Sequence, residues 1–262
     1  MFYNNFPEEL GFKSGDKGGT HSSRTIMFDD LSTIIDQVPP ESKHDAYVDA
    51  IVKDNALHKD TFSTRKHSAQ RLTELYLLDP QAPLFRVMRR FWPHDPKGRV
   101  LMALLCALAR DPKLRLTASF VLDLSQGEEL MRRKITDSLK ARLKDRLNDA
   151  ILDKVIRNAS SSWTQSGHLQ GRVRKCRYKV QATPHSAVYA LLLGYLQGVR
   201  GARLFDTGWT KVLDASIDEL RFLVLEAKRL GLLDLKIAGD VVEIGFSNLL
   251  TPQEMRDARV TN

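Results

Sequence analysis

The sequence predicts a mainly α-helical bundle that ends in a β-hairpin. Apolar residues recur at intervals of three and four along much of the chain, which is the period of a helix facing a core. The ten prolines punctuate these stretches and therefore predict several short helices. Alternation, which is typical of strands, appears near the C-terminus in two runs: Leu233, Leu235, Ile237 and Val242, Ile244, Phe246.

The composition indicates a globular chain. Its 262 residues are 42% hydrophobic and 27% charged, enough for one sizeable core or two modest ones. The longest apolar runs, 100–109 and 187–196, are shorter than the roughly 20 residues of a membrane-spanning helix, so both predict buried helices. The N-terminus lacks the basic-then-apolar layout of a secretory signal, and we expect no membrane association and a cytoplasmic location.

The N-terminal half reads as a tail followed by a helical domain. Residues 1–20 are rich in Gly, Lys, Asn and Ser, which predicts a mobile tail, and residues 21–126 predict an N-terminal helical domain. We expect its helices over residues 29–36, 41–55, 83–92, 97–110 and 113–122, with another that begins after a cap at Ser63 or Thr64.

Residues 127–262 predict a helix-turn-helix region followed by a C-terminal module. Apolar residues recur every four positions from Ile135 to Val155. Each such step drifts by about 40° on a helix, so we expect a break near Asn148. We then expect a helix that ends at Asn158, a Ser-rich turn, and a second helix from Ser161 or Ser162, which together form a helix-turn-helix.

The C-terminal module resembles a winged helix in its order of elements. Ser216 can cap a helix that runs to Arg229 and is stopped by Gly231, and the two alternating runs follow as a hairpin. This helix mixes acidic and basic residues, which is a poor surface for phosphates. We therefore expect the module to have a structural or protein-docking role.

Charge is strongly segregated along a chain of net charge +8. Residues 132–179 hold fourteen basic and four acidic residues, and residues 65–99 hold eight and three. Residues 205–262 are instead acidic, with seven basic and ten acidic residues. This segregation favours a polyanionic partner for the middle of the chain, although a solvated helix face would give a similar pattern.

No motif predicts catalysis. The seven histidines are scattered, and HExxH, paired CxxC, GxSxG and phosphate-loop patterns do not occur. Cys106 lies in an apolar run and predicts a core residue, while Cys176 has basic neighbours but no evident catalytic partner. We expect no enzymatic activity, metal, cofactor or small-molecule substrate, and a nuclease site built from distant acids remains the alternative.

Nucleic-acid contacts are expected around the basic stretch. Cations anchor phosphates, and short polar side chains at the start of a recognition helix can reach base edges. We interpret Trp163 as a core residue, although it and Tyr178 could stack on bases. The candidate contacts are Arg172, Arg174, Lys175, Arg177, Lys179, Ser162, Thr164, Gln165, His168, Arg65 and Lys66.

Several stretches between about residues 55 and 250 resemble BrxA, the small helical subunit of BREX bacteriophage-exclusion systems. The similar segments are Ser-Thr-Arg-Lys at 63–66, Leu-Tyr-Leu-Leu-Asp-Pro-Gln-Ala-Pro-Leu-Phe-Arg at 75–86, Leu-Leu-Cys-Ala-Leu-Ala-Arg-Asp-Pro at 104–112, Ser-Gly-His-Leu-Gln-Gly-Arg at 166–172 and Leu-Gly-Tyr-Leu-Gln-Gly-Val-Arg-Gly at 193–201. The resemblance implies a helical, NusB-like protein with helix-turn-helix elements that binds double-stranded DNA in phage defence, alongside a methyltransferase, an ATPase and a phosphatase-like protein. It transfers no catalytic motif.

These observations favour a non-enzymatic, largely sequence-independent double-stranded DNA-binding component of a BREX-type antiphage system, with other BREX proteins as partners. Two alternatives remain. One is a scaffold subunit whose basic face docks an acidic protein. The other is an RNA-binding protein, which the NusB-like resemblance suggests.

Overall fold

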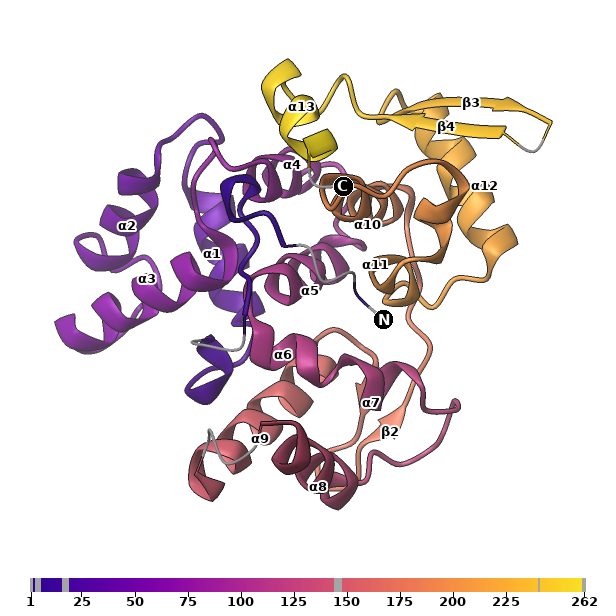
Figure 1. The fold of residues 1–262 in the computed structure, drawn as a ribbon. Helices are drawn as coiled ribbons and strands as arrows, with labels where there is room; N and C mark the ends of the chain where they lie inside the picture. The colour runs from indigo at the N-terminus through magenta and orange to yellow at the C-terminus, as the bar shows by residue number, and fades with distance from the viewer. Residues whose placement is uncertain (1, 3–5, 16–18, 144–147, 240, 261–262) are drawn as a thin grey trace. The chain divides into compact units, whose positions relative to one another are not determined.

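The structure is a computed structural model that describes residues 2, 6–15, 19–143, 148–239 and 241–260. It is mainly helical with a β-hairpin near the C-terminus, as the sequence predicts (Figure 1). The chain forms two compact units: Met1–Ser14, Asp79–Ala109 and Gln181–Asn262 make the first, and Gly15–Leu78 and Arg110–Val180 make the second. The units are interleaved along the chain, which differs from the consecutive division expected at residues 20 and 126.

The first half of the second unit contains the predicted helices before residue 79. These are α1 (Phe28–Gln37), α2 (His44–Val52) and α3 (Phe62–Tyr76), preceded by the short 3-10 helix η2 (Thr20–Ser22). Thr61 caps α3, because its hydroxyl accepts a hydrogen bond from the Thr64 N–H at 3.1 Å. The cap therefore lies two residues before the earlier of the two expected positions.

The rest of the second unit holds four helices and two short strands, which are α6 (Pro112–Leu116), α7 (Ala118–Leu122), α8 (Arg132–Leu143), α9 (Asp149–Gln165), β1 (Leu169–Gln170) and β2 (Cys176–Arg177). The helix expected over 113–122 is divided at Thr117. The break expected near Asn148 is confirmed, since Asn148 caps α9 by accepting a hydrogen bond from the Ile151 N–H at 2.8 Å.

The turn expected after Asn158 is wrong. Helix α9 continues to Gln165, because its buried face continues through Ala159, Ser162 and Trp163 at helical spacing. Trp163 is a core residue, as expected, and its indole N–H donates to the Thr117 hydroxyl at 2.9 Å.

The first unit contains nine elements in addition to the 3-10 helix η1 (Glu8–Leu10). These are α4 (Pro83–Phe91), α5 (Arg99–Arg110), α10 (Pro184–Leu196), the 3-10 helix η3 (Gly201–Asp206), α11 (Gly208–Lys211), α12 (Ile217–Arg229), β3 (Asp234–Ala238), β4 (Val241–Gly245) and α13 (Pro252–Val260). The C-terminal module is as predicted: Ser216 caps α12, and β3 pairs antiparallel with β4.

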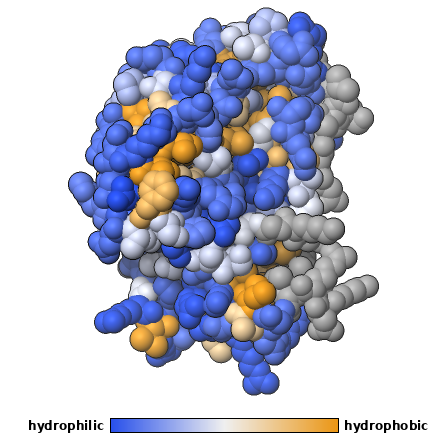
Figure 2. All heavy atoms as spheres, turned by 90° about the vertical axis from the view of Figure 1, so that its left-hand side faces the viewer, coloured by the Kyte–Doolittle hydropathy of each residue, from blue (hydrophilic) through white to orange (hydrophobic). Residues whose placement is uncertain are grey.

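The two longest apolar runs are buried helices, as expected. From Leu101 to Ala109 in α5 and from Ser186 to Leu196 in α10 every residue is buried, including Cys106. No helix among the described residues is both long and apolar enough to cross a membrane. Figure 2 shows one face on which hydrophilic atoms dominate and hydrophobic atoms form separate patches.

Part of the segment expected to be a mobile tail belongs to a core. Leu10 and Phe12 are each 1% exposed, and the Phe12 ring lies 6.0 Å from the Trp209 ring within the first unit. The expectation fails here because composition does not reveal that two apolar side chains in a Gly- and Lys-rich segment are covered by residues far along the chain.

Candidate nucleic-acid interface

The second unit has the element order of a winged helix between α6 and β2. Helices α6 and α7 are followed by an extended segment at 128–130, by α8 and α9, and by the β1–β2 ribbon (Figure 1). The extended segment pairs with β2: Leu130 N–H donates to Lys175 O, and Arg177 N–H donates to Glu128 O, both at 2.8 Å. Strand β2 therefore lies between this segment and β1. We call residues 112–179 the basic module and the turn at 171–175 the wing.

Helices α8 and α9 of the basic module share a small hydrophobic core. Ile135 and Leu139 of α8 meet Leu152 and Ile156 of α9, and all four are at most 2% exposed. Burying each such side chain contributes about 1.5–3 kcal/mol. Of the four-residue stripe, the first two positions, Ile135 and Leu139, belong to this core. Helix α9 contributes Leu152 and Ile156, each one position after the stripe residues Ile151 and Val155. The two helices that pack together in this region are α8 and α9, which is one helix earlier than the expected pair.

A buried polar network fixes α9 to α6. The Asp111 carboxylate caps α6 by accepting the Lys113 N–H at 2.9 Å, and it contacts His21 Nδ1 at 2.8 Å. His21 Nε2 lies 2.8 Å from Ser162 Oγ in α9. Burial by itself would raise the pKa of Asp111, but attraction to His21 and the hydrogen bonds outweigh burial and lower the pKa to about 2.

This Ser–His–Asp set has the bonding order of a hydrolase triad but is enclosed. Ser162 and His21 are 0% exposed, and Ser162 Oγ also accepts the Ile26 N–H at 3.0 Å. A substrate could not reach this hydroxyl without displacing the core. We therefore assign Ser162 a structural role, which corrects its expected role as a DNA contact.

The exposed face of α9 carries cations and short polar groups. Lys154 and Arg157 are exposed, Ser161 and Thr164 are half-buried, and Gln165 is exposed. Their spacing of three and four places them on one stripe, away from the buried face. The Gln165 amide donates to Thr25 Oγ1 at 3.1 Å and remains at the surface.

Sequence reasoning missed Lys154 and Arg157 as candidate contacts. Their three-residue separation, after a helix cap at Asn148, is the signal that could have identified them. In the part of the chain that the structure describes, neither side chain makes an ion pair with a carboxylate. Both are therefore available to an anionic partner.

The wing presents Arg172, Val173 and Arg174 to solvent. Val173 is 91% exposed and the Arg174 side chain is 80% exposed. The turn requires glycine at its start, since Gly171 has φ +111° and a Cβ there would lie 1.9 Å from Arg174 O. The Glu129 carboxylate accepts a hydrogen bond from Arg174 Nε at 2.9 Å, forms an ion pair with Nη2 at 2.7 Å, and raises the pKa of this guanidinium.

Lys175 joins the wing to α9. Its ammonium donates to Thr164 Oγ1 at 2.7 Å, and burial lowers the pKa of this half-buried lysine. Lys175 therefore positions the wing beside the last turn of α9. The Thr164 hydroxyl accepts this hydrogen bond, so Thr164 also helps to hold the wing against α9.

Two further expected contacts are buried. Arg177 is 5% exposed and its guanidinium donates to the backbone oxygens of His168 and Tyr178. His168 is 0% exposed, with its ring edge-on to Trp163 at 5.0 Å. Both expectations are corrected, because these side chains hold the base of the ribbon.

Lys179 and Tyr178 lie exposed just after β2.

Arg65 and Lys66 lie elsewhere in the second unit, on α3. Arg65 is half-buried and donates to Val52 O at 3.3 Å. Lys66 is exposed, with its ammonium 4.7 Å from the centre of the Phe62 ring. Helix α3 contacts α2 and η2, whereas Lys175 joins the wing to α9, so Arg65 and Lys66 lie on a different helix from the cations of α9 and the wing.

The acidic residues of the described α8 and α9 face cations. Asp153 pairs with Arg132, Asp149 with Lys140 at 2.8 Å, and Asp137 with Arg133 at 3.8 Å. Such exposed pairs are worth about 0–1 kcal/mol, so they hold the cations only loosely. The surplus positive charge of the basic module is therefore at its surface.

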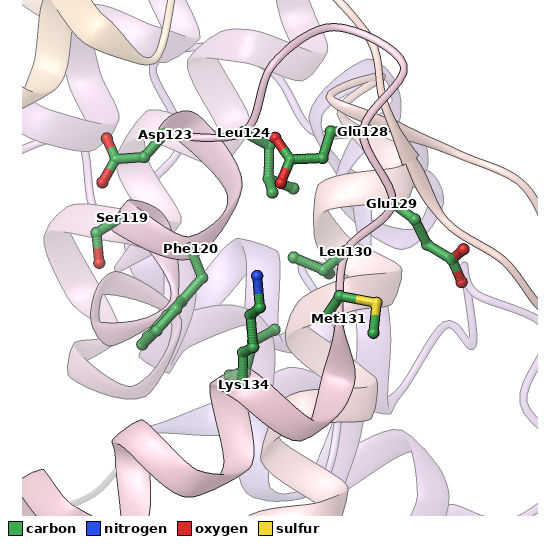
Figure 3. A pocket seen from close by; sticks show the side chains of 10 residues that line it. Ser119, Phe120, Asp123, Leu124, Glu128, Glu129, Leu130, Met131 and Lys134 are labelled. Atoms are coloured by element: carbon green, nitrogen blue, oxygen red, sulfur yellow. The ribbon is translucent and has the colours of Figure 1, made fainter.

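A pocket of about 250 Å³ lies between α7, the 128–130 segment and α8. Figure 3 shows the Lys134 ammonium pointing into it, with the Glu128 carboxylate and the Leu130 side chain nearby. Lys134 is thus directed into the pocket. Among the described residues, no group of three or more His, Cys, Asp or Glu side chains is arranged to hold a metal ion.

The candidate interface consists of one helix face and one adjacent wing. The exposed cations are Lys154, Arg157, Arg172 and Arg174, of which Arg174 is paired with Glu129, and Lys179 is exposed beyond the ribbon. Such groups can neutralise phosphates and make short polar contacts. No protein-family model and no curated protein matches this chain.

Proposed function

We propose that the basic module binds double-stranded DNA through α9 and the wing, with contacts that are mostly to phosphates. The observation that carries this proposal is the winged-helix order of elements. Lys154 and Arg157, which pair with no carboxylate among the described residues, lie on the exposed face of α9, and the arginine-bearing wing stands beside its last turn. A helix fits the major groove of B-form DNA, which is about 12 Å wide.

The alternative partners fit this surface less well. The major groove of an RNA helix is too deep and narrow for α9, so a helix-based reader favours DNA over duplex RNA. An acidic protein partner would need an apolar centre in the interface. Among the described residues, α9 exposes no large apolar side chain and the wing exposes a single one, Val173, at its tip.

Salt dependence tests this proposal. If about five cations neutralise phosphates, the logarithm of the association constant for a random duplex should fall with the logarithm of salt concentration at a slope of about −4 to −5. A gel-shift or fluorescence-anisotropy series measures this slope. A slope near zero would contradict the proposal.

The resemblance to BrxA extends the proposal to phage defence. A subunit that binds DNA without catalysis would bring the cytoplasmic BREX proteins to DNA or hold them there. In a host carrying the intact gene cluster, Ala replacements of Lys154, Arg157 and Arg172 should lower phage exclusion while the protein stays abundant. Normal exclusion by a variant that has lost DNA binding would favour the scaffold function.

A further inference from the structure

The tip of the wing combines two arginines with the most exposed large apolar side chain among the described residues. Val173 is 91% exposed and lies between Arg172 and Arg174. An exposed apolar residue alone is common and needs no explanation. Here, however, it stands at the end of a projecting turn between two cations, and a surface that only attracted phosphates would gain nothing from it.

The wing is held in one shape before any partner binds. Strand β2 pairs on one side with β1 and on the other with the 128–130 segment. Gly171 makes the tight turn, and Lys175 fastens the base of the wing to Thr164 of α9. An ordered tip has little conformational entropy to lose when it enters a narrow site.

The position of the wing relative to α9 selects the groove. When α9 lies in the major groove, a wing fastened beside its last turn meets the flanking sugar–phosphate strand and the groove beyond it. The minor groove is about 6 Å wide, which admits an extended turn but no helix. Its negative potential attracts arginine, and apolar side chains of minor-groove proteins contact or wedge between bases at its floor.

We propose that Arg172, Val173 and Arg174 enter the minor groove and give the protein a preference for A·T-rich duplexes. This inference rests on the proposed function. The two guanidinium groups lie along the groove walls, and Val173 contacts the base edges on the floor. Guanine places its 2-amino group on that floor and so obstructs Val173, whereas A·T pairs leave it open.

Inosine substitution tests which groove is read. Inosine lacks the 2-amino group of guanine but keeps its major-groove acceptors, so an inosine duplex resembles G·C in the major groove and A·T in the minor groove. We expect the wild-type protein to bind A·T-rich and inosine duplexes about fivefold more tightly than the matching G·C duplex at equal salt, measured by fluorescence anisotropy. Equal affinity for the inosine and G·C duplexes would overturn the inference.

Two variants show whether the wing causes the preference. Val173→Ser should bring the ratio between inosine and G·C duplexes close to one, and Arg172→Ala should lower both the ratio and the affinity. The matched control is Val241→Ser, an exposed valine in the β3–β4 hairpin that should leave the ratio unchanged. If Val173→Ser left the ratio of affinities for the inosine and G·C duplexes unchanged, the preference would come from duplex flexibility and the inference would be overturned.

The outcomes separate this inference from the proposed function. Salt-dependent duplex binding without any inosine effect refutes the minor-groove contact and leaves DNA binding standing. Absence of salt-dependent duplex binding by the wild-type protein refutes both.

Discussion

The basic module and the C-terminal module share an order of elements but differ in surface. Each places a hairpin directly after a helix, β1–β2 after α9 and β3–β4 after α12. Six of the ten exposed large apolar side chains in the described chain belong to the C-terminal helix and hairpin, namely Ile217, Phe222, Leu225, Leu230, Ile237 and Val241. Helix α9 has none of them. Function is therefore indicated by the side chains on the exposed helix face and not by the topology.

The charges of α12 also differ from those of α9. Arg221 pairs with Asp218 at 3.7 Å and Arg229 with Glu226 at 2.7 Å, so acidic groups accompany its cations. A cavity of about 430 Å³ between α12 and the hairpin is lined mainly by apolar side chains. Neither feature suits a phosphate backbone, which supports the expectation that this module does not read DNA.

The largest expected effect is on the network that holds α9, which is particular to the basic module. Asp111→Asn removes the charge that His21 faces in a buried pair and should destabilise the protein by about 3–5 kcal/mol, measured by urea unfolding. Asp60→Asn, an exposed position of the same unit, is the control and should change stability little. A loss under about 1 kcal/mol for Asp111→Asn would contradict a holding role for the network.

The same carboxylate predicts a pH dependence. Because the pKa of Asp111 is about 2 in the folded protein and 3.8 in the reference state, its stabilising contribution is present above pH 3.8 and is lost as pH falls towards 2. Urea unfolding followed across this range should show the loss in the wild-type protein and a smaller one in Asp111→Asn. Parallel curves for the two proteins would argue against this assignment.

The next effect compares DNA affinity between the two modules. Replacing Lys154, Arg157 and Arg172 with Ala should weaken binding to every duplex about 100-fold at moderate salt and make the salt slope less steep by about 3. Reversing Arg221 and Lys228 to Glu in α12 should change affinity little. Circular dichroism should show that both variants keep their helices. A comparable loss from the α12 variant would identify the C-terminal module as the reader.

The smallest expected effect concerns the acid beside the wing. Glu129→Gln removes the anion that holds Arg174 and should strengthen duplex binding about two- to threefold. The reason is that Arg174 no longer has to give up its ion pair with Glu129 in order to bind DNA. Glu243→Gln, which frees Lys236 in the β3–β4 hairpin, is the matched control and should have no effect. Fluorescence anisotropy measures both, and weaker binding by Glu129→Gln would show that Glu129 orients Arg174 for DNA.

The sequence predicted those parts of the fold that local chemistry determines. The cap at Ser216 and the alternating strands of the β3–β4 hairpin follow from short-range patterns. The basic wing was predicted as a charged stretch, but two-residue strands are too short to show alternation. Their pairing with Glu129 joins positions distant in the chain, which no local pattern reveals.

The misplaced turn after Asn158 has a comparable cause. Serines favour turns and caps by bonding to nearby backbone, so a serine-rich segment predicts a turn. In the structure Ser162 bonds to His21, and Trp163 is buried against Thr117, so tertiary contacts keep the helix continuous. The same contacts turn Lys154 and Arg157 outward, and the local pattern therefore located the positive charge but not the side chains that present it.

Site-specific crosslinking tests most directly whether the basic module contacts DNA. A photoreactive side chain would be introduced at Gln165 in α9 or at Phe222 in α12, both of which are exposed. After irradiation with a random duplex, we expect DNA adducts from position 165 and none above background from position 222. Adducts from position 222 without adducts from position 165 would contradict the assignment of DNA binding to α9 and the wing.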